Sequence, residues 1–362
     1  MNIDEFLRVA VKKRASDIHI RVGTPPMLRI DGRIVPTEMR PMTPADTKRT
    51  LYSMLSNAQR DAFEKAQEMD VSFMISGLAR FRVNIFMEQG HVGAVLRVIP
   101  INVPNLDNLG LPEQIRKFTE ERTGLILVTG PTGSGKTTTL AGMIDYINAQ
   151  KDVHIITIED PIEFVYRNKR SIITQRELVN DTSSFPNAIK YALRQDPDII
   201  LVGEMRDRDT IESALKAAET GHLVLSTLHT NDAVQTINRV INAFPPHEQT
   251  QILKQMAAVL RGTIAQRLAI KQDGIGRVPI NEILVVTPTV RDHIFKHELD
   301  DIYGLIARGE NDGMQSMNQS LFGYYEQELI SFEEALRLSD NVNELHQWKR
   351  GAFSGSGSGG AR

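Results

Sequence analysis

The stretch that most constrains this chain is the run Gly-Pro-Thr-Gly-Ser-Gly-Lys-Thr at residues 130–137. It matches G-x-x-x-x-G-K-[ST], the pattern of a phosphate-binding loop. The apolar run 125–128 precedes it and predicts a buried strand, and residues 138–144 follow it with the pattern of a helix. Strand, loop and helix in this order are the context that such a loop requires, so we expect a nucleotide site here.

The loop residues have separate roles in holding a triphosphate. The glycines let the backbone curl so that successive N–H groups point at one anion, and the helix N-terminus adds unpaired donors. Lys136 can reach the β- and γ-phosphates, and the hydroxyl of Thr137 can bind Mg²⁺. The expected nucleotide contacts are Gly130, Thr132, Gly133, Ser134, Gly135, Lys136, Thr137 and Thr138.

Composition excludes several other classes of protein. The chain has 362 residues, enough for about two domains, and its formal net charge of -3 gives no overall attraction to nucleic acid. It has no cysteines, which excludes disulfides, thiolate zinc sites and cysteine nucleophiles. No apolar run is long enough to span a membrane, and the acidic start lacks a signal-peptide layout. We therefore expect any membrane connection to run through a partner.

Residues 1–99 predict a mixed α+β domain. Apolar residues at helical spacing open the chain, and the period then changes to two over residues 18–22. Asp31 and Gly32 predict a hairpin turn, and Thr43 is the expected cap of a helix that starts at Pro44.

A second hairpin, over residues 80–98, places two like charges together. If Gln89 and Gly90 form its two-residue turn, Arg82 lies directly across from Arg97 on one face of the sheet. Like charges at this separation are unfavourable unless an anion lies between them. The alternative is that both arginines are simply solvated on an open sheet face.

The second half of the chain has a different pattern. Residues 100–112 are rich in Pro, Gly, Asn and Asp and predict a linker. From 113 to 353, apolar strands first alternate with helices, which is typical of a parallel sheet covered on both faces, and the chain after about residue 290 is helical. The low-complexity stretch 354–362 predicts a disordered tail, whether natural or added. The expected strands are 125–129, 154–158, 199–202 and 223–227.

Acidic residues follow two of these strands. Glu204 comes just after the apolar run 199–202, at the sheet edge where ligands of parallel-sheet folds bind. It suits an acid that activates water or holds Mg²⁺ through water, although a plain helix-start acid is the alternative. Glu159, Asp160 and Glu163 form a second cluster, which either faces a cation or is a solvated turn.

Two histidines flank the strand at 223–227. His229 lies just past its end, on the same edge as Glu204, where it can touch the γ-phosphate. His222 lies at the opposite end, and we expect it to contact another segment or subunit instead. No spacing supports a zinc site.

These blocks together resemble the secretion-type ATPases of type IV pilus and type II secretion machines, and within them the pilus retraction ATPases. The resemblance covers nearly the whole chain. It is carried by residues 130–137, 157–163, 196–204 and 219–230, and also by 16–19, 80–84, 174–177 and 203–207.

The resemblance implies an α/β protein with a PAS-like α+β N-terminal domain, a RecA-like P-loop ATPase domain and a helical C-terminal extension. It implies a homo-hexamer that binds ATP and Mg²⁺ between the domains, with Arg82 and Arg97 near the γ-phosphate. From the motifs themselves we hypothesise that Thr137, Glu159 and Glu204 hold the metal. We expect Glu204 to activate water and Glu163 to assist.

It also implies a cytoplasmic motor, peripheral at the inner-membrane base of a type IV pilus, that drives retraction and twitching motility. The implied partners are a membrane platform protein, the pilin fibre through it, and a paralogous motor ATPase.

One segment departs from the family pattern. Pilus retraction members typically carry Ala-Ile-Arg-Asn-Leu-Ile-Arg-Glu, whereas residues 289–296 here are Thr-Val-Arg-Asp-His-Ile-Phe-Lys. Arg291 and Ile294 remain, but the leucine and the final Arg-Glu pair are replaced. An accessory retraction paralogue, an assembly or secretion ATPase, and a non-motor nucleotide switch therefore stay open. Assembly members usually carry a four-cysteine zinc element, which this chain lacks.

Overall fold

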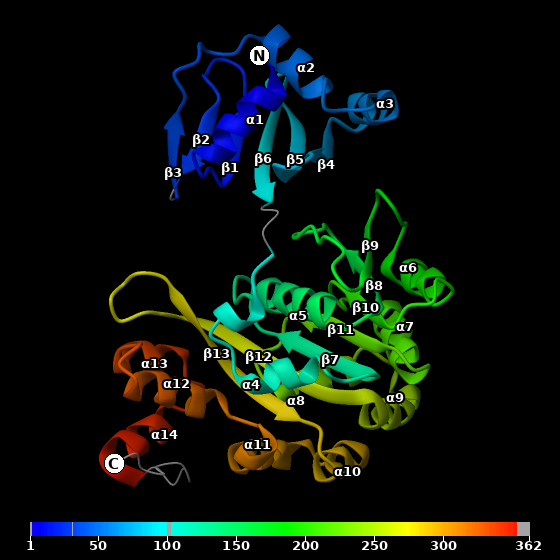
Figure 1. Ribbon diagram of the computed structural model, residues 1–362, viewed down its shortest axis with the longest axis vertical. Helices are drawn as coiled ribbons and strands as arrows, with labels where there is room; N and C mark the ends of the chain where they lie inside the picture. The colour runs from blue at the N-terminus through cyan, green and yellow to red at the C-terminus, as the bar shows by residue number, and fades with distance from the viewer. Residues whose placement is uncertain (1, 31, 100–102, 353–362) are drawn as a thin grey trace. The chain divides into compact units, whose positions relative to one another are not determined.

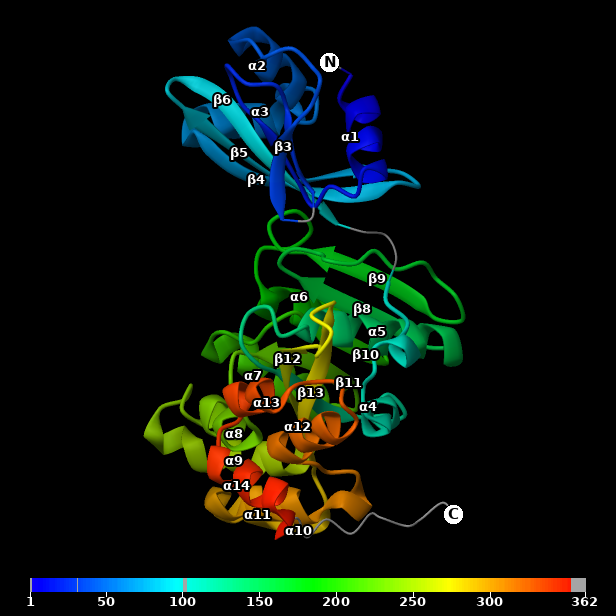
Figure 2. The same cartoon turned by 90° about the vertical axis from the view of Figure 1, so that its left-hand side faces the viewer.

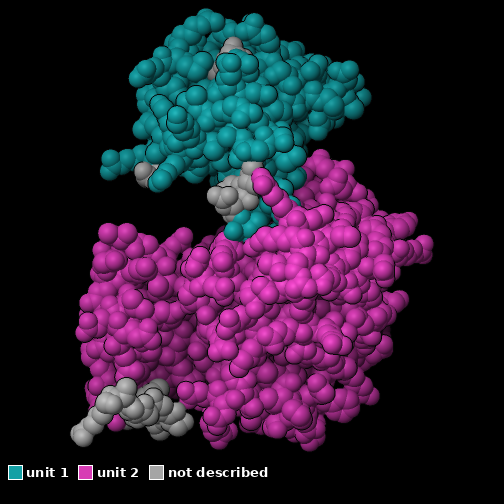
Figure 3. Space-filling model, viewed as in Figure 1, with its two compact units in different colours: residues 1–103, 163–166 teal, residues 104–162, 167–362 magenta. Residues whose placement is uncertain are grey.

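The computed structural model describes residues 2–30, 32–99 and 103–352. Asp31, residues 100–102 of the expected linker and the expected tail at 354–362 lie outside these described residues. The chain divides into two compact units, one of residues 1–103 and 163–166 and one of residues 104–162 and 167–362 (Figure 3). We call them unit 1 and unit 2.

The described part of unit 1 is built from an antiparallel sheet and three helices (Figure 1), which agrees with the expected mixed α+β domain, although α3 was not predicted. The sheet has six strands in the order β3-β2-β1-β6-β5-β4. The elements are α1 (Ile3–Lys12), β1 (Asp17–Ile20), β2 (Met27–Ile30), β3 (Arg33–Pro36), α2 (Pro44–Tyr52), α3 (Asn57–Ala66), β4 (Glu68–Ile75), β5 (Ala79–Glu88) and β6 (His91–Ile99).

One face of this sheet is buried and the other carries charge. Phe81, Val83 and Ile85 on β5 are fully buried in one cluster with residues of all three helices. Alternation along the strand sends the intervening side chains to the opposite face. Thr43 caps α2 through a capping box with Asp46, which confirms the expected start of that helix.

Unit 2 is a largely parallel sheet with helices around it (Figures 1 and 2). Its elements are η1 (Leu106–Asn108), α4 (Glu113–Phe118), β7 (Gly124–Thr129), α5 (Lys136–Gln150), β8 (His154–Glu159), β9 (Ile172–Glu177), α6 (Phe185–Ala192), β10 (Ile199–Val202), α7 (Arg208–Glu219), β11 (Leu223–Leu228), α8 (Ala233–Ile241), α9 (Pro246–Val259), β12 (Leu260–Ile270), β13 (Arg277–Val285), α10 (Pro288–Lys296), η2 (Leu299–Asp301), α11 (Ile302–Arg308), η3 (Glu310–Asp312), α12 (Met317–Glu326), α13 (Phe332–Leu338), α14 (Val342–Gln347) and η4 (Trp348–Ala352).

The sheet of unit 2 contains all four strands that the sequence predicts, β7, β8, β10 and β11, and they are parallel. The strand order is β13-β12-β7-β11-β10-β8-β9. β9, β12 and β13 were not predicted. β12 follows α9 without an intervening residue, since α9 ends at Val259 and β12 begins at Leu260. No Gly, Pro or Asn marks that boundary, so the pattern gave no sign of it.

β12 joins two parts of unit 2. It pairs in parallel with β7 on one side and antiparallel with β13 on the other. Residues of β12 and β13 form one apolar cluster with the C-terminal helices, including Leu321 of α12, Ala335 of α13 and Leu345 of α14. The last helices of the predicted helical end, α12 to α14, are therefore packed on this strand pair, whereas α10 and α11 belong to another apolar cluster of unit 2.

The segment expected as a linker is partly anchored to unit 2. Leu106 in η1 is buried, and a Cβ built on Gly142 of α5 would lie 3.0 Å from Leu109 Cδ1 and 3.3 Å from the Cα of Leu106. Over the described part of the chain, no helix combines the length and the apolar character needed to cross a membrane.

Candidate nucleotide site

The phosphate-binding pattern forms a loop between β7 and α5. β7 is buried along its whole length. Gly130, Gly133 and Gly135 have φ angles of 141°, 82° and 88°, in the region that residues with a Cβ rarely adopt. Thr132 and Gly133 are exposed at the tip of the loop.

Two of these glycines are also required by the close approach of β12. A Cβ built on Gly130 would lie 2.3 Å from the carbonyl oxygen of Gln266, and one built on Gly135 would lie 2.8 Å from Gln266 Nε2. Real Cβ atoms do not approach other atoms so closely. The neighbouring strand, as well as the turn itself, therefore excludes larger residues at both positions.

The loop and the first turn of α5 offer donors for an anion. α5 has 15 residues and starts at Lys136, and its N-cap residue Gly135 provides no side-chain cap, so its first N–H groups are open to a ligand. The buried hydroxyl of Ser134 has no hydrogen-bond partner among the described residues. Thr137 and Thr138 are half-buried in this first turn. A phosphate group fits this set of donors.

Lys136 is buried and folded back over the loop. Its Nζ donates to the carbonyl oxygens of Gly130 at 2.8 Å and Pro131 at 3.0 Å. The ammonium group is therefore held where a phosphate on the loop would meet it.

Glu204 and His229 meet at the carboxyl edge of the sheet. Glu204 Oε2 lies 3.4 Å from His229 Nε2, and Glu204 Oε1 pairs with Arg206 at 2.5 Å. The hydrogen bond from Arg206 to Glu204 raises the pKa of that guanidinium. The side chain of Glu204 is 14% exposed, so this carboxylate can still be reached from one side.

Backbone and side-chain hydrogen bonds hold the Glu204 segment in place. Thr227 Oγ1 donates to the carbonyl of Gly203 at 2.7 Å, and the N–H of Met205 donates to the carbonyl of Thr227 at 3.1 Å. The N–H of Gly203 donates to Ile158 at 2.8 Å. The ends of β8, β10 and β11 are thus tied together around Glu204.

Glu159 lies at the same edge, at the end of β8. It is buried, and its Oε1 accepts hydrogen bonds from Thr157 Oγ1 at 2.7 Å and Gln175 Nε2 at 3.3 Å. Glu163 is exposed and falls in unit 1, so its assistance to Glu204 stays a prediction. Within the described residues, no three His, Asp or Glu side chains are grouped closely enough to hold a metal by themselves.

The strand register places the two histidines at opposite ends of β11. Leu228 pairs with Thr129, so His229 follows directly beside the start of the phosphate loop. His222 precedes β11, and its Nδ1 lies 2.9 Å from the carbonyl oxygen of Ala217. His222 thus contacts the end of α7 in its own chain. Contact with another subunit stays untested.

Unit 1 carries the second group of predicted residues. Arg82 and Arg97 are directly opposed on β5 and β6, and the turn at Gln89 and Gly90 has two residues with positive φ. The register that the hairpin pattern predicts is therefore confirmed.

Carboxylates on the flanking strands accompany these arginines. Arg97 Nε donates to Asp17 Oδ1 at 2.9 Å, and Arg82 lies 3.6 Å from Asp70 Oδ2. Asp17 on β1 is directly opposite Arg97. The like charges thus have protein anions nearby, and the approach of both arginines to a nucleotide stays a prediction.

The arginine face is also hollowed. A shallow depression of about 250 Å³ lies over the two arginines and is lined by Asp17, Asp70, Arg82, Asn84, Val95 and Arg97. It leaves room for a further group to meet the guanidinium groups of unit 1.

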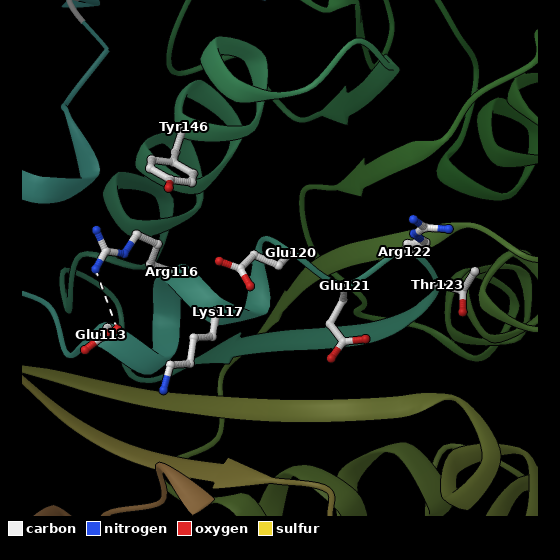
Figure 4. A pocket seen from close by; sticks show the side chains of 8 residues that line it. All are labelled: Glu113, Arg116, Lys117, Glu120, Glu121, Arg122, Thr123 and Tyr146. Carbon is white, nitrogen blue, oxygen red and sulfur yellow. Dashed lines mark ion pairs between the residues drawn. The ribbon is translucent and has the colours of Figure 1, made fainter.

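A larger open hollow, of about 790 Å³, lies elsewhere in unit 2 (Figure 4). It is formed by α4, the turn before β7 and Tyr146 of α5, at the opposite end of β7 from the phosphate loop. Its lining mixes both signs of charge, and Glu113 and Arg116 pair at 3.7 Å along α4. The loop is the candidate nucleotide site, because three glutamates, Glu113, Glu120 and Glu121, stand among the cations of the hollow.

Three residues of these sites were missed by sequence reasoning: Gln266, Asp17 and Asp70. Asp17 stands in the run Ser-Asp-Ile-His at 16–19, which carries the resemblance and begins the alternating strand pattern, but no role was expected for it. Its alternation with apolar neighbours was a signal that it shares a face with the arginines. Gln266 had no such signal.

Comparisons with known proteins agree with this geometry. Residues 1–337 match the family model described as type II/IV secretion system protein. A type IV pilus retraction ATPase, PilT, from Pseudomonas aeruginosa is 45% identical over 335 residues, which is 92% of this chain and 97% of that protein. The type IV pilus ATPase PilU from the same organism is 40% identical over 345 residues, or 95% and 90% of the two chains.

A solved structure shares the architecture. The crystal structure of the pilus retraction motor PilT with bound ADP superimposes with a TM-score of 0.90 at 46% identity. It covers 96% of this chain and 99% of that chain. This confirms the predicted fold class, an α+β N-terminal domain followed by a RecA-like ATPase domain.

Proposed function

Because this chain belongs to the type II/IV secretion system protein family, we propose that it is an ATP-hydrolysing motor that powers retraction of a type IV pilus. The relatives at 45% identity include a pilus retraction ATPase and a twitching motility protein of Neisseria gonorrhoeae. The observation that carries the proposal is the phosphate loop of β7 beside Glu204 and His229 at one sheet edge.

Each group at this edge has a distinct task. Lys136 and the loop N–H groups bind the β- and γ-phosphates, and Lys136 neutralises charge that develops on the γ-phosphate. Glu204 accepts a proton from the attacking water, because it is partly exposed and held at the strand end. His229, which faces Glu204, touches the γ-phosphate side of the site.

Mg²⁺ is proposed as the resident metal. Thr137 in the first turn of α5 would hold it directly, and Glu159 and Glu204 would hold it through water. Hydroxyl and carboxylate oxygens are the ligands that Mg²⁺ prefers, so these residues fit it. When bound, the ion neutralises phosphate charge.

Arg82 and Arg97 are proposed to complete the charge clamp. Both side chains are substantially exposed, 46% and 69%, beside the depression of unit 1. Guanidinium groups aimed at a transferring phosphoryl group stabilise its transition state. Since they belong to a different unit from the loop, a clamp built this way would couple hydrolysis to domain movement.

We propose a homo-hexameric ring, cytoplasmic and peripheral at the inner-membrane base of the pilus. Its partners would be a platform protein and, through it, the pilin fibre. An accessory role beside a paralogous retraction motor is the second candidate, because the similarity to PilU spans as much of the chain as the similarity to PilT. The altered segment 289–296 forms α10, with Val290 and Ile294 buried and Arg291 exposed.

The chemistry is tested with two substitutions in the purified protein. Glu204→Gln should bind ATP like the parent but lose most turnover, whereas Lys136→Ala should weaken nucleotide binding itself. Normal hydrolysis by Glu204→Gln would remove Glu204 from the role of general base.

The cellular role is tested by deleting the gene and scoring surface pili and twitching together. A retraction motor leaves abundant pili that do not retract, whereas loss of pili indicates an assembly ATPase. If the protein is an accessory paralogue, its deletion impairs twitching, and overproduction of the main retraction motor restores it. A nucleotide switch would show no steady-state turnover.

A further inference from the structure

Gln266 lies on β12 directly behind the phosphate loop. It is 2% exposed, and its Nε2 donates to the carbonyl oxygen of Ser134 at 2.7 Å. This is a contact between a buried side chain and the middle of the loop, 132 residues earlier in the chain. None of the proposed nucleotide contacts includes this residue.

The side-chain oxygen of Gln266 also has hydrogen-bond partners. Gln266 Oε1 accepts hydrogen bonds from Thr139 Oγ1 at 2.8 Å and from Asn281 Nδ2 at 3.1 Å. Thr139 lies on α5, one turn after the loop, and Asn281 on β13. Both are buried. A single amide thus connects the loop, the helix that follows it and the strand pair beside it.

These partners fix the orientation of the amide. The carbonyl of Ser134 can only accept, so the amide nitrogen must face it, and the donors of Thr139 and Asn281 then meet the oxygen. A side chain with only acceptors or only apolar atoms would leave buried polar groups without partners. Glutamine is therefore specified by chemistry as well as by size.

The same network reaches the C-terminal helices. The N–H of Asn281 donates to Ser320 Oγ on α12 at 3.2 Å, and Gln315 Nε2 donates to the carbonyl of Asn281 at 2.9 Å. Gln315 pairs with Ile283 of β13, and its side-chain hydrogen bond goes to Asn281 rather than to the loop. The network thus connects α12, through Asn281 and Gln266, to the carbonyl of Ser134.

We infer that Gln266 is a positioning residue for nucleotide binding, which holds the loop around Ser134 in its anion-binding shape through the amide of its side chain. This rests on the proposed binding of nucleotide at the loop. Gln266 is buried behind the loop, so it acts on the ligand through the backbone that the ligand meets. Without the Gln266 side chain, the loop populates conformations that do not bind nucleotide. The apparent affinity for nucleotide then falls in proportion to the fraction of the binding conformation.

The first test compares two glutamines of the same layer. Gln266→Leu removes both halves of the network, whereas Gln315→Leu removes one bond to Asn281 away from the loop. Affinity for a fluorescent ADP analogue, measured by titration on the full chain, should fall about tenfold for Gln266→Leu, the size expected from one lost buried hydrogen bond. Gln315→Leu should bind like the parent, although both variants melt at lower temperature.

The second test uses a variant of nearly the same shape. Gln266→Glu keeps the acceptor for Thr139 and Asn281 but, when ionised, places an oxygen against the carbonyl of Ser134. Its affinity relative to the parent should be lowest at pH 9 and should recover toward pH 5.5, where a protonated carboxyl again donates to Ser134. A purely structural role does not produce this dependence.

Unchanged affinity in Gln266→Leu, an equal loss in Gln315→Leu, or a pH-independent ratio for Gln266→Glu would each overturn the inference. The proposed function fails separately. If the parent binds the ADP analogue but does not hydrolyse ATP, the motor proposal is wrong while the positioning role of Gln266 stands.

Discussion

Arg97 and Asp17 face each other across β6 and β1, and the guanidinium Nε donates to Asp17 Oδ1 at 2.9 Å. The opposed Arg82 has a weaker partner, since its nearest Asp70 oxygen is 3.6 Å away. Asp17 is 10% exposed at its side chain and Asp70 is 53% exposed. One arginine of the pair is therefore held firmly and the other is held loosely.

The electrostatics of Asp17 support this difference. Burial acts to raise the pKa of the Asp17 carboxyl, but the hydrogen bonds from Arg97 and Ser16 and the charges of Arg97 and Arg29 outweigh it. The net pKa lies below its ordinary value, so the carboxylate is ionised wherever the protein is assayed near neutral pH. It is a fixed anchor for Arg97.

We predict that Asp17→Asn slows ATP turnover much more than Asp70→Asn does. Without this anchor, Arg97 can move away from its position. The loss of one charge-assisted hydrogen bond should lower kcat about tenfold. The KM for ATP should change little, because the loop binds the ground state. Steady-state kinetics check this, with Asp70→Asn as the matched control; equal effects of the two would contradict it.

Arg82→Ala and Arg97→Ala should each fold, bind nucleotide and hydrolyse ATP slowly. Removal of one group that stabilises transition-state charge costs on the order of 100-fold in kcat. Arg80→Ala, on the same face of β5 but outside the depression, is the control. If both variants hydrolyse ATP at the rate of the parent, the two arginines do not contribute to hydrolysis.

We predict that replacing the Glu282 carboxyl with a neutral group raises the folding stability of the protein in a pH-dependent way. Glu282 is 4% exposed on β13, and burial raises its pKa from 4.5 to about 7, against the hydrogen bond from the N–H of Ala233 and with help from the charges of Asp232 and Asp340. A raised folded-state pKa means that folding stability is lost as pH rises from 4.5 through 7.

Glu282→Gln keeps the acceptor for Ala233 and removes that loss. It should melt like the parent at pH 4.5 and be more stable at pH 8, by at most ~3 kcal/mol. Denaturant titrations at both pH values measure this. The exposed Glu326→Gln serves as the control, and the same gain at both pH values would exclude ionisation as the cause.

We predict that replacing Val179 with glycine stabilises the protein. Val179 is 87% exposed and has a φ of 71°, a conformation that is strained for a β-branched residue. Val179→Gly should stabilise the protein by about 1 kcal/mol. Val35→Gly, at an exposed strand position on β3, should destabilise it by about 1 kcal/mol instead. Melting temperatures of the two variants check the opposite signs.

Local patterns in the sequence were enough for much of this fold. Alternation on β5 and β6, together with a two-residue turn, gave the pairing of Arg82 with Arg97. The apolar runs of β7, β8, β10 and β11 gave the parallel sheet, and the rule for its carboxyl edge brought Glu204 beside His229.

The rest depends on contacts between segments far apart in the chain. Gln266 meets Ser134 only because β12 pairs with β7, and nothing near residue 266 announces that pairing. Asp17 reaches Arg97 because β1 inserts beside β6, 80 residues away. Such partners are set by sheet order, which periodicity along one strand does not specify.

The approach of β12 to the phosphate loop divides its three glycines into two kinds. Gly130 and Gly135 face atoms of Gln266, whereas a Cβ on Gly133 would meet nothing within 4 Å. In a library carrying every residue at each position, 130 and 135 should accept almost nothing but glycine. Position 133 should accept asparagine and aspartate, because only its left-handed backbone restricts it. A motif written with three identical letters would thus evolve at different rates along its length.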